Sequence, residues 1–204
     1  MNAPTVNERS DDSGPKQQSP TIYTAAVLFG GAIPAQDVSK KDPLHAVGVA
    51  PAGLALQGAH AGSLFAVLQG PAIGIALWDP IARIAALGHL LLPSSRSALT
   101  PAAVAADPGR YVDSGLAALF ERMARQGGVL NRMIVTMAGG GQVGAAKDLF
   151  QVGTRNVTAA RKVLWMSQLL ISKEDVGGVG ERTLIINTES GDCSVEKADA
   201  SCAV

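Results

Sequence analysis

Between Pro43 and Trp78 the chain carries no Asp, Glu, Lys or Arg, and this stretch constrains the fold more than any other feature. An uncharged apolar segment of this length could cross a membrane as a helix. Pro51, Pro71 and six glycines interrupt it too often for a continuous spanning helix. The stretch therefore predicts buried strands joined by turns, with no membrane insertion.

The clearest strand pattern lies in the second half of this stretch and just after it. A first apolar run covers residues 64–68, and in residues 72–77 apolar or small side chains occupy both faces, as in a fully buried strand. Asp79-Pro80 is a turn signal, and a second apolar run covers residues 84–92 up to Pro93. We expect a hairpin that carries His89 near its far end.

Weaker patterns predict the other elements. We expect strands at residues 23–29 and 133–137 and a hairpin of 183–188 and 193–195. A first helix, closed by Gly127-Gly128, has on one face Val112, Leu116, Leu119, Phe120 and Met123. A second helix, capped by Thr154 and ending near Leu170, has on one face Val157, Ala160, Leu164 and Ile171. This order predicts an α/β (mixed α+β) fold, a single-domain layered sandwich with buried strands and two main helices. We expect a disordered tail at residues 1–20, one domain at 21–197 and a C-terminal tail at 198–204.

Composition narrows the function classes. Lys+Arg and Asp+Glu number 17 each, which argues against nucleic acid as a partner. The two cysteines, Cys193 and Cys202, lie near the C-terminus and make no disulfide framework. The polar first residues do not resemble a signal peptide, so we expect a cytoplasmic protein. His45 and His60 lack partners at metal-ligand spacing, and no Lys-Ser/Thr follows the glycines at 139–141. We expect no metal and no cofactor.

Six segments and Arg182, in order along the chain from Trp78 onward, resemble the CheD chemoreceptor glutamine deamidases. The segments are Asp79-Pro80-Ile81-Ala82-Arg83, Gly88-His89-Leu90-Leu91-Leu92-Pro93, Pro108-Gly109-Arg110-Tyr111-Val112-Asp113, Ala138-Gly139-Gly140, Val152-Gly153-Thr154-Arg155-Asn156-Val157 and Glu174-Asp175-Val176-Gly177-Gly178. The resemblance implies a single α/β domain that hydrolyses glutamine side chains of methyl-accepting chemoreceptors to glutamate. It also implies association with CheC, a phosphatase of the phosphorylated response regulator.

The resemblance implies a site in which this chain departs from the family. The family's nucleophilic cysteine lies in a Leu-Gly-Ser-Cys-Val motif before the Asp-Pro turn, and its base is the histidine of a His-x-x-Leu-Pro motif, which His89 matches. Counting back from Asp79 without a gap puts Ala72 at the cysteine and Ala66 at the family's active-site threonine. No cysteine, serine or threonine lies between Phe65 and Ser94, so no shift of the alignment restores either side chain.

Two main hypotheses about function follow. In the first, the chain is a CheD-like chemotaxis protein that binds chemoreceptor helices, or a CheC-type phosphatase, without catalysis, because alanine cannot attack an amide or hold an acyl group. In the alternative, it is an active glutamine deamidase that uses His89 and an unrecognised nucleophile, for which Cys193 is the candidate. A small, half-buried strand residue is the other interpretation of Cys193. A diverged domain of unrelated function is the third hypothesis. Arg155-Asn156 could orient a substrate amide, bind an acidic group of a partner, or cap and pack the helix.

Overall fold

Two apolar runs, joined by a turn at Asp79 and Pro80, form the central hairpin of the fold: β4 (Ile73–Asp79) and β5 (Ile84–Leu90). Every residue of both strands is buried. Ile73, Ile75 and Leu77 contribute to the core under the helices, whereas Ala76 and Trp78 belong to a second core. Because β4 meets one apolar layer on each face, it needs apolar side chains at every position. The predicted hairpin is confirmed.

The computed structural model describes residues 46–59, 62–142 and 150–197. The predicted strand at 23–29, the predicted tails, His45, His60 and Cys202 lie outside these residues. The other strands are β1 (Ala46–Gly48), β2 (Leu54–Gly58), β3 (Ser63–Leu68), β6 (Ile134–Gly139), β7 (Ile171–Val176), β8 (Arg182–Asn187) and β9 (Cys193–Lys197). The helices are α1 (Pro101–Ala106), α2 (Val112–Arg125) and α3 (Val152–Met166), and short 3-10 turns cover Ser95–Ser97, Pro108–Arg110 and Leu130–Arg132.

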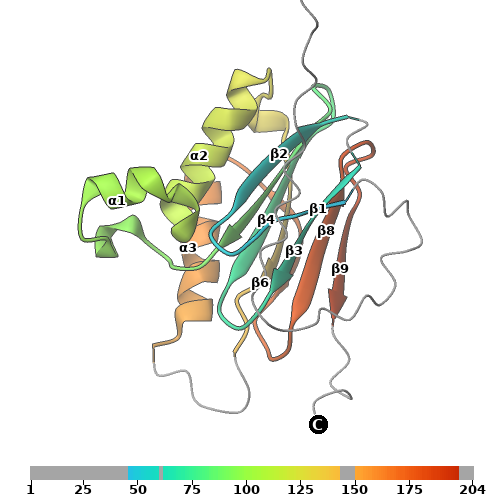
Figure 1. The fold of residues 1–204 in the computed structure, drawn as a ribbon. Helices are drawn as coiled ribbons and strands as arrows, with labels where there is room; N and C mark the ends of the chain where they lie inside the picture. Colours follow the sequence, from blue (N-terminus) through green and yellow to red (C-terminus); the bar gives the residue numbers. More distant parts are fainter. Residues whose placement is uncertain (1–45, 60–61, 143–149, 198–204) are drawn as a thin grey trace, which may run out of the picture. The chain divides into compact units, whose positions relative to one another are not determined.

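The strands form two sheets, which stack as separate layers (Figure 1). One sheet has the strand order β2-β5-β4-β6-β7, and the other has the order β1-β3-β8-β9. Helices α2 and α3 cover the outer face of the five-stranded sheet, through buried side chains such as Leu119 and Leu164. The four-stranded sheet covers its other face, where Leu64 and Leu184 pack. The predicted mixed α/β sandwich with two main helices is confirmed.

Asp79 fixes the turn between the two central strands. Its carboxylate is fully buried and accepts hydrogen bonds from the backbone N–H groups of Ile81, Ala82 and Val129, and from Arg132 Nε at 2.7 Å. Burial alone would raise the pKa of Asp79, but the Arg132 side chain and the three backbone donors outweigh it and bring the pKa to about 2. The Asp-Pro segment is therefore a structural clamp between the hairpin and the approach to β6.

Three predictions at the second main helix were wrong. Thr154 lies in the first turn of α3 instead of capping it, since Gln151 occupies the cap position with a left-handed backbone and no capping side-chain bond. The helix ends at Met166, four residues earlier than expected. Ile171 belongs to the edge strand β7 and does not share a helical face with Leu164.

Candidate functional site

The positions that the sequence comparison singled out, 66, 72 and 89, all face the layer between the two sheets. In the antiparallel β4–β5 pair His89 lies directly opposite Gly74. Ala72 comes two residues before Gly74, just ahead of β4, and the alternation of the strand extended by one residue places it on the same face, diagonally across from His89. Diagonal neighbours have β-carbons within roughly 7–8 Å, a distance that an imidazole ring can bridge.

Ala66 approaches the same place from the other sheet. Its side chain is fully buried, and in the β3–β8 pair it lies opposite Leu184. A methyl group of Leu184 lies 3.0 Å from the point where a β-carbon on Gly74 would stand. Leu184 thus connects position 66 with Gly74, the residue opposite His89, and the side chains at positions 66 and 72 are methyl groups.

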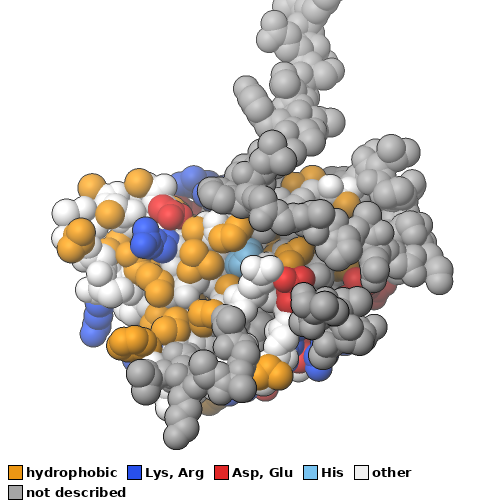
Figure 2. Space-filling view, turned by 60° about the horizontal axis from the view of Figure 1, so that its bottom comes forward, with side chains coloured by type: hydrophobic (Ala, Val, Ile, Leu, Met, Phe, Trp, Pro, Cys, Tyr) orange, Lys and Arg blue, Asp and Glu red, His pale blue; other side chains and the backbone are white. Residues whose placement is uncertain are grey.

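His89 is buried and neutral in character. Its side chain is 3% exposed, and its Nδ1 lies 3.3 Å from the carbonyl oxygen of Val49. Burial lowers the pKa of His89 below its usual value, and the Val49 carbonyl opposes this only in part. Figure 2 shows that apolar side chains, drawn in orange, gather on the face that comes forward in this view. Because burial disfavours the imidazolium, the environment favours the neutral ring, which is the form that accepts a proton.

Close backbone contacts fix the position of Ala72. Its carbonyl oxygen accepts a hydrogen bond from the N–H of Gly140 at 2.7 Å. Gly139, the residue before Gly140, has a φ of +98°, and a β-carbon at position 139 would stand 2.4 Å from the carbonyl oxygen of Ala72. Only glycine tolerates both the left-handed backbone and the close contact with this carbonyl oxygen at position 139. The glycine run therefore lets the end of β6 approach the start of β4.

Asn156 ties the two central strands together beside this point. From α3 its Nδ2 donates to the carbonyl oxygens of Pro71 and Leu91, both at 2.8 Å, and the residue is fully buried. Pro71 directly precedes Ala72, and Leu91 follows His89 by two residues. For Asn156 the structure supports the packing role that the sequence left open, whereas the neighbouring Arg155 is exposed.

Cys193 does not complete the site. It lies half-buried in β9, and its thiol donates to the carbonyl oxygen of Gly191 at 3.7 Å. Burial raises the pKa of this thiol, and the nearby Thr136 on β6 opposes that rise in part. Strand β6 is separated from β5, the strand of His89, by β4. Two strand spacings correspond to roughly 10 Å, which is far beyond hydrogen-bond reach. Within the described part of the chain, no thiol is placed to act with His89.

Two further classes of site find no support in the described residues. Among them, no group of three or more His, Cys, Asp or Glu side chains could hold a metal ion. None of the helices of the described segments is long and apolar enough to cross a membrane.

Comparisons with known proteins place this geometry in a family context. The family model for CheD, described as CheD chemotactic sensory transduction, matches residues 91–197. The match begins two residues after His89 and so includes none of positions 66, 72 and 89. A probable chemoreceptor glutamine deamidase CheD of Solibacter usitatus is 34% identical over 122 residues, which are 60% of this chain and 71% of that protein. The corresponding protein of Caldanaerobacter subterraneus is 35% identical over 133 residues, which are 64% of this chain and 80% of that protein.

Proposed function

This chain belongs to the CheD family, and we propose that it binds the cytoplasmic part of chemoreceptors without deamidating them. The observation that carries the proposal is the side chain of Ala72. It is a methyl group, 5% exposed, at the position diagonal to His89. The relatives are named as chemoreceptor glutamine deamidases, so receptors are the partner class that the family suggests.

The chemistry of amide hydrolysis explains why this methyl group matters. A nucleophile must add to the carbonyl carbon, expel ammonia and hold the acyl group until water releases it. A thiolate paired with a histidine can do this, because the imidazole removes the thiol proton. At position 72 the carbon–hydrogen bonds of alanine offer neither a lone pair nor an acidic proton. His89 would remain a base with no nucleophile beside it.

The intact surroundings of the site support binding as the remaining activity. Asn156 still holds the backbone of Pro71 and Leu91, and Gly140 still holds the carbonyl of Ala72. Arg182, which is 6% exposed, bonds to Asp175 at 2.9 Å and to the carbonyl of Gly177, and so fixes the turn after β7. The framework is thus kept in order around a position that has lost its reactive group.

A second candidate function is a residual deamidase in which His89 activates water. The buried, neutral His89 favours it, because a neutral imidazole is the form that accepts a proton. A CheC-type phosphatase is a further proposed partner, and the cytoplasm is the proposed location.

A binding measurement tests the proposal. The full chain would be titrated with a purified chemoreceptor cytoplasmic fragment, and in parallel with a CheC-type protein, by isothermal titration calorimetry. We expect saturable binding to the receptor fragment and no conversion of glutamine to glutamate in its mass spectrum. Absence of binding to the receptor fragment would contradict the proposal, and conversion by the natural protein would favour the second candidate.

A further inference from the structure

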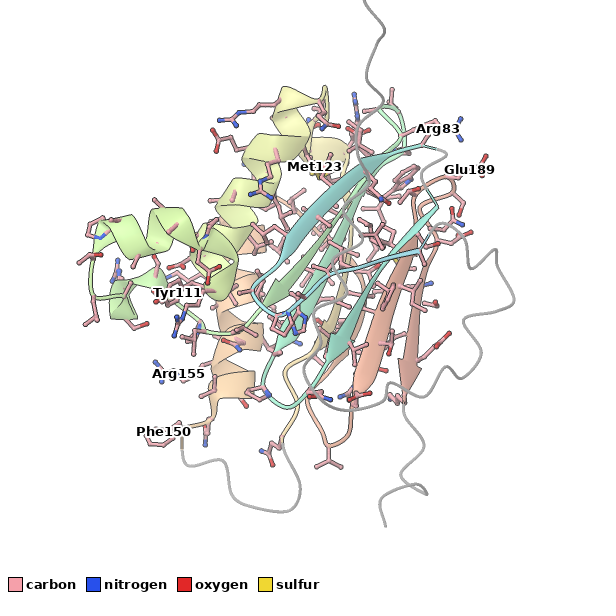
Figure 3. The ribbon with its side chains drawn as sticks, in the orientation of Figure 1. Arg83, Tyr111, Met123, Phe150, Arg155 and Glu189 are labelled. Carbon is pink, nitrogen blue, oxygen red and sulfur yellow. The ribbon has the colours of Figure 1, made fainter. Side chains whose placement is uncertain are left out.

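A hollow opens on the surface between the segment after β5, the segment around α1 and the first turn of α3. It encloses about 460 Å³. Its lining includes Leu92, Pro93, Leu99, Arg110, Tyr111 and Arg155. A second hollow adjoins it and shares Ala98 and Leu99 with it. We call the two together the α1 groove. Figure 3 shows Tyr111 and Arg155 on the side of α3 that faces α1.

An apolar side chain, that of Leu99, borders the α1 groove and is fully exposed. Leu99 is 99% exposed and contributes to both hollows. Tyr111 forms part of the floor and is 6% exposed. A leucine side chain that reaches full exposure beside a hollow leaves apolar area for a partner to cover.

The charge of the α1 groove has one sign. Arg96, Arg110 and Arg155 are exposed and line it, and neither hollow has an Asp or Glu in its lining. None of these three guanidinium groups forms an ion pair with a described residue. Three exposed arginines elsewhere on the described surface pair with carboxylates: Arg83 with Glu189, Arg125 with Glu121 and Arg161 with Glu174. A fourth, Arg122, donates to the carbonyl oxygen of Leu54.

The acidic side chain of Asp113, near the groove, is already occupied. It accepts hydrogen bonds from the hydroxyl groups of Ser94 and Ser95 and from the backbone N–H of Ser95. These bonds hold the start of the 3-10 turn Ser95–Ser97 against α2. Asp113 is therefore not available to pair with the three arginines, and a partner with carboxylates complements them.

The α1 groove is continuous with the candidate site through the backbone. Leu92 and Arg155 line the groove, and their immediate neighbours are Leu91 and Asn156. Asn156 bonds to the carbonyl oxygens of Leu91 and Pro71, and Ala72 follows Pro71. A chain segment seated in the groove would therefore run beside the loop that carries position 72.

We propose that the α1 groove is the docking surface for a chemoreceptor helix that presents apolar side chains together with carboxylates. This inference rests on the proposed function and specifies the surface that performs it. Leu99 packs against the apolar side chains of the helix, while Arg110 and Arg155 pair with its carboxylates. An amphipathic helix in an apolar groove with charged edges is a common mode of protein recognition.

Charge reversal at the groove tests this assignment, with a matched change on the same helix as the control. Arg155→Glu changes a groove residue, and Lys162→Glu makes a charge reversal of the same kind on the same face of α3, two turns or about 10 Å further along and outside the groove lining. Leu99→Asp is matched by Leu170→Asp, which changes a leucine that is 80% exposed beyond the end of α3. Receptor-fragment affinity is measured for each by calorimetry at low and high salt, with circular dichroism to verify folding.

We expect Arg155→Glu and Leu99→Asp each to weaken binding at least about tenfold, the loss typical of breaking a central contact of an interface. The two control variants should remain within about twofold of the natural protein, and salt should weaken the natural protein more than Arg155→Glu. Equal affinity of the groove variants and the natural protein would overturn the groove while leaving the proposed function intact. Failure of the natural protein itself to bind would overturn both.

Discussion

Replacing Asp79 by asparagine should destabilise the fold by an amount that depends on pH in a calculable way. The carboxylate is fully buried and has a pKa of about 2 in the folded chain, against an ordinary value of 3.8. At about 1.4 kcal/mol per pH unit, this difference corresponds to about 2.5 kcal/mol of folding free energy from the ionised group. Asparagine, which resembles the protonated acid, cannot supply it.

The sign of the pH dependence follows from the lowered pKa. A carboxyl group whose folded pKa is lowered contributes its full stabilisation above its unfolded pKa, near pH 4, and loses it as the pH falls toward 2. The natural protein should therefore lose about 2 kcal/mol relative to Asp79→Asn between pH 5 and pH 2. Because other carboxylates titrate in both proteins alike, the comparison isolates Asp79.

Urea unfolding followed by circular dichroism at several pH values measures this difference. Asp192→Asn is the control, because its carboxylate is exposed and, among the described side chains, accepts a hydrogen bond only from the Ser190 hydroxyl. This variant should change the free energy of unfolding by less than about 0.5 kcal/mol at any of these pH values. A gap between natural protein and Asp79→Asn that stays constant from pH 5 to pH 2 would refute the argument.

Two further predictions concern the loop and the histidine of the candidate site. Gly139→Ala should lower the free energy of unfolding by about 3 kcal/mol or more, because its β-carbon would collide with the carbonyl oxygen of Ala72. Gly127→Ala is the control: Gly127 has a φ of +88° but no atom within 4 Å of its β-carbon position, so the change should cost only about 1 kcal/mol. Equal losses in urea unfolding would contradict the close approach. The His89 ring should titrate below its usual value of 6.5 in NMR spectra, with His89→Gln identifying its signal, because burial disfavours the imidazolium. A titration at or above 6.5 would contradict the buried environment.

Local patterns in the sequence were enough to predict the centre of the fold. The β4–β5 hairpin was visible because both its strands are apolar on both faces and a turn signal separates them. The end of α2 was visible as well, because Gly127 adopts a left-handed backbone and Gly128 N–H bonds back to the carbonyl of Met123. Glycine at this position is the usual signal for such an ending.

The end of α3 shows why the same kind of signal can be missed. Gln168 adopts a left-handed backbone with φ of +58°, and the N–H of Leu169 bonds back to the carbonyl of Leu164. This is the ending that α2 uses, but with glutamine in place of glycine, so the sequence gives no warning of it. Strand β7 was missed for a related reason: Ser172, Lys173 and Glu174 are exposed on an edge strand and break the apolar alternation.

For the candidate site, the sequence identified positions and the structure supplied their relation. Spacing from Asp79 picked out Ala72 and Ala66, but only the pairing of β4 with β5 and of β3 with β8 shows how these positions relate to His89. The α1 groove was not predicted, because Leu99 and Arg155 are far apart in the chain. Their proximity depends on how the segment after β5 packs against α3.

The most direct test of the account is a deamidation assay on a chemoreceptor cytoplasmic fragment, read by mass spectrometry as conversion of glutamine to glutamate. It would compare the natural protein, Ala72→Cys, Ala72→Cys combined with His89→Gln, and an active CheD protein. We predict no conversion by the natural protein, conversion by Ala72→Cys, and its loss when His89 is also replaced. Conversion by the natural protein at a rate similar to that of the active CheD protein would contradict the account.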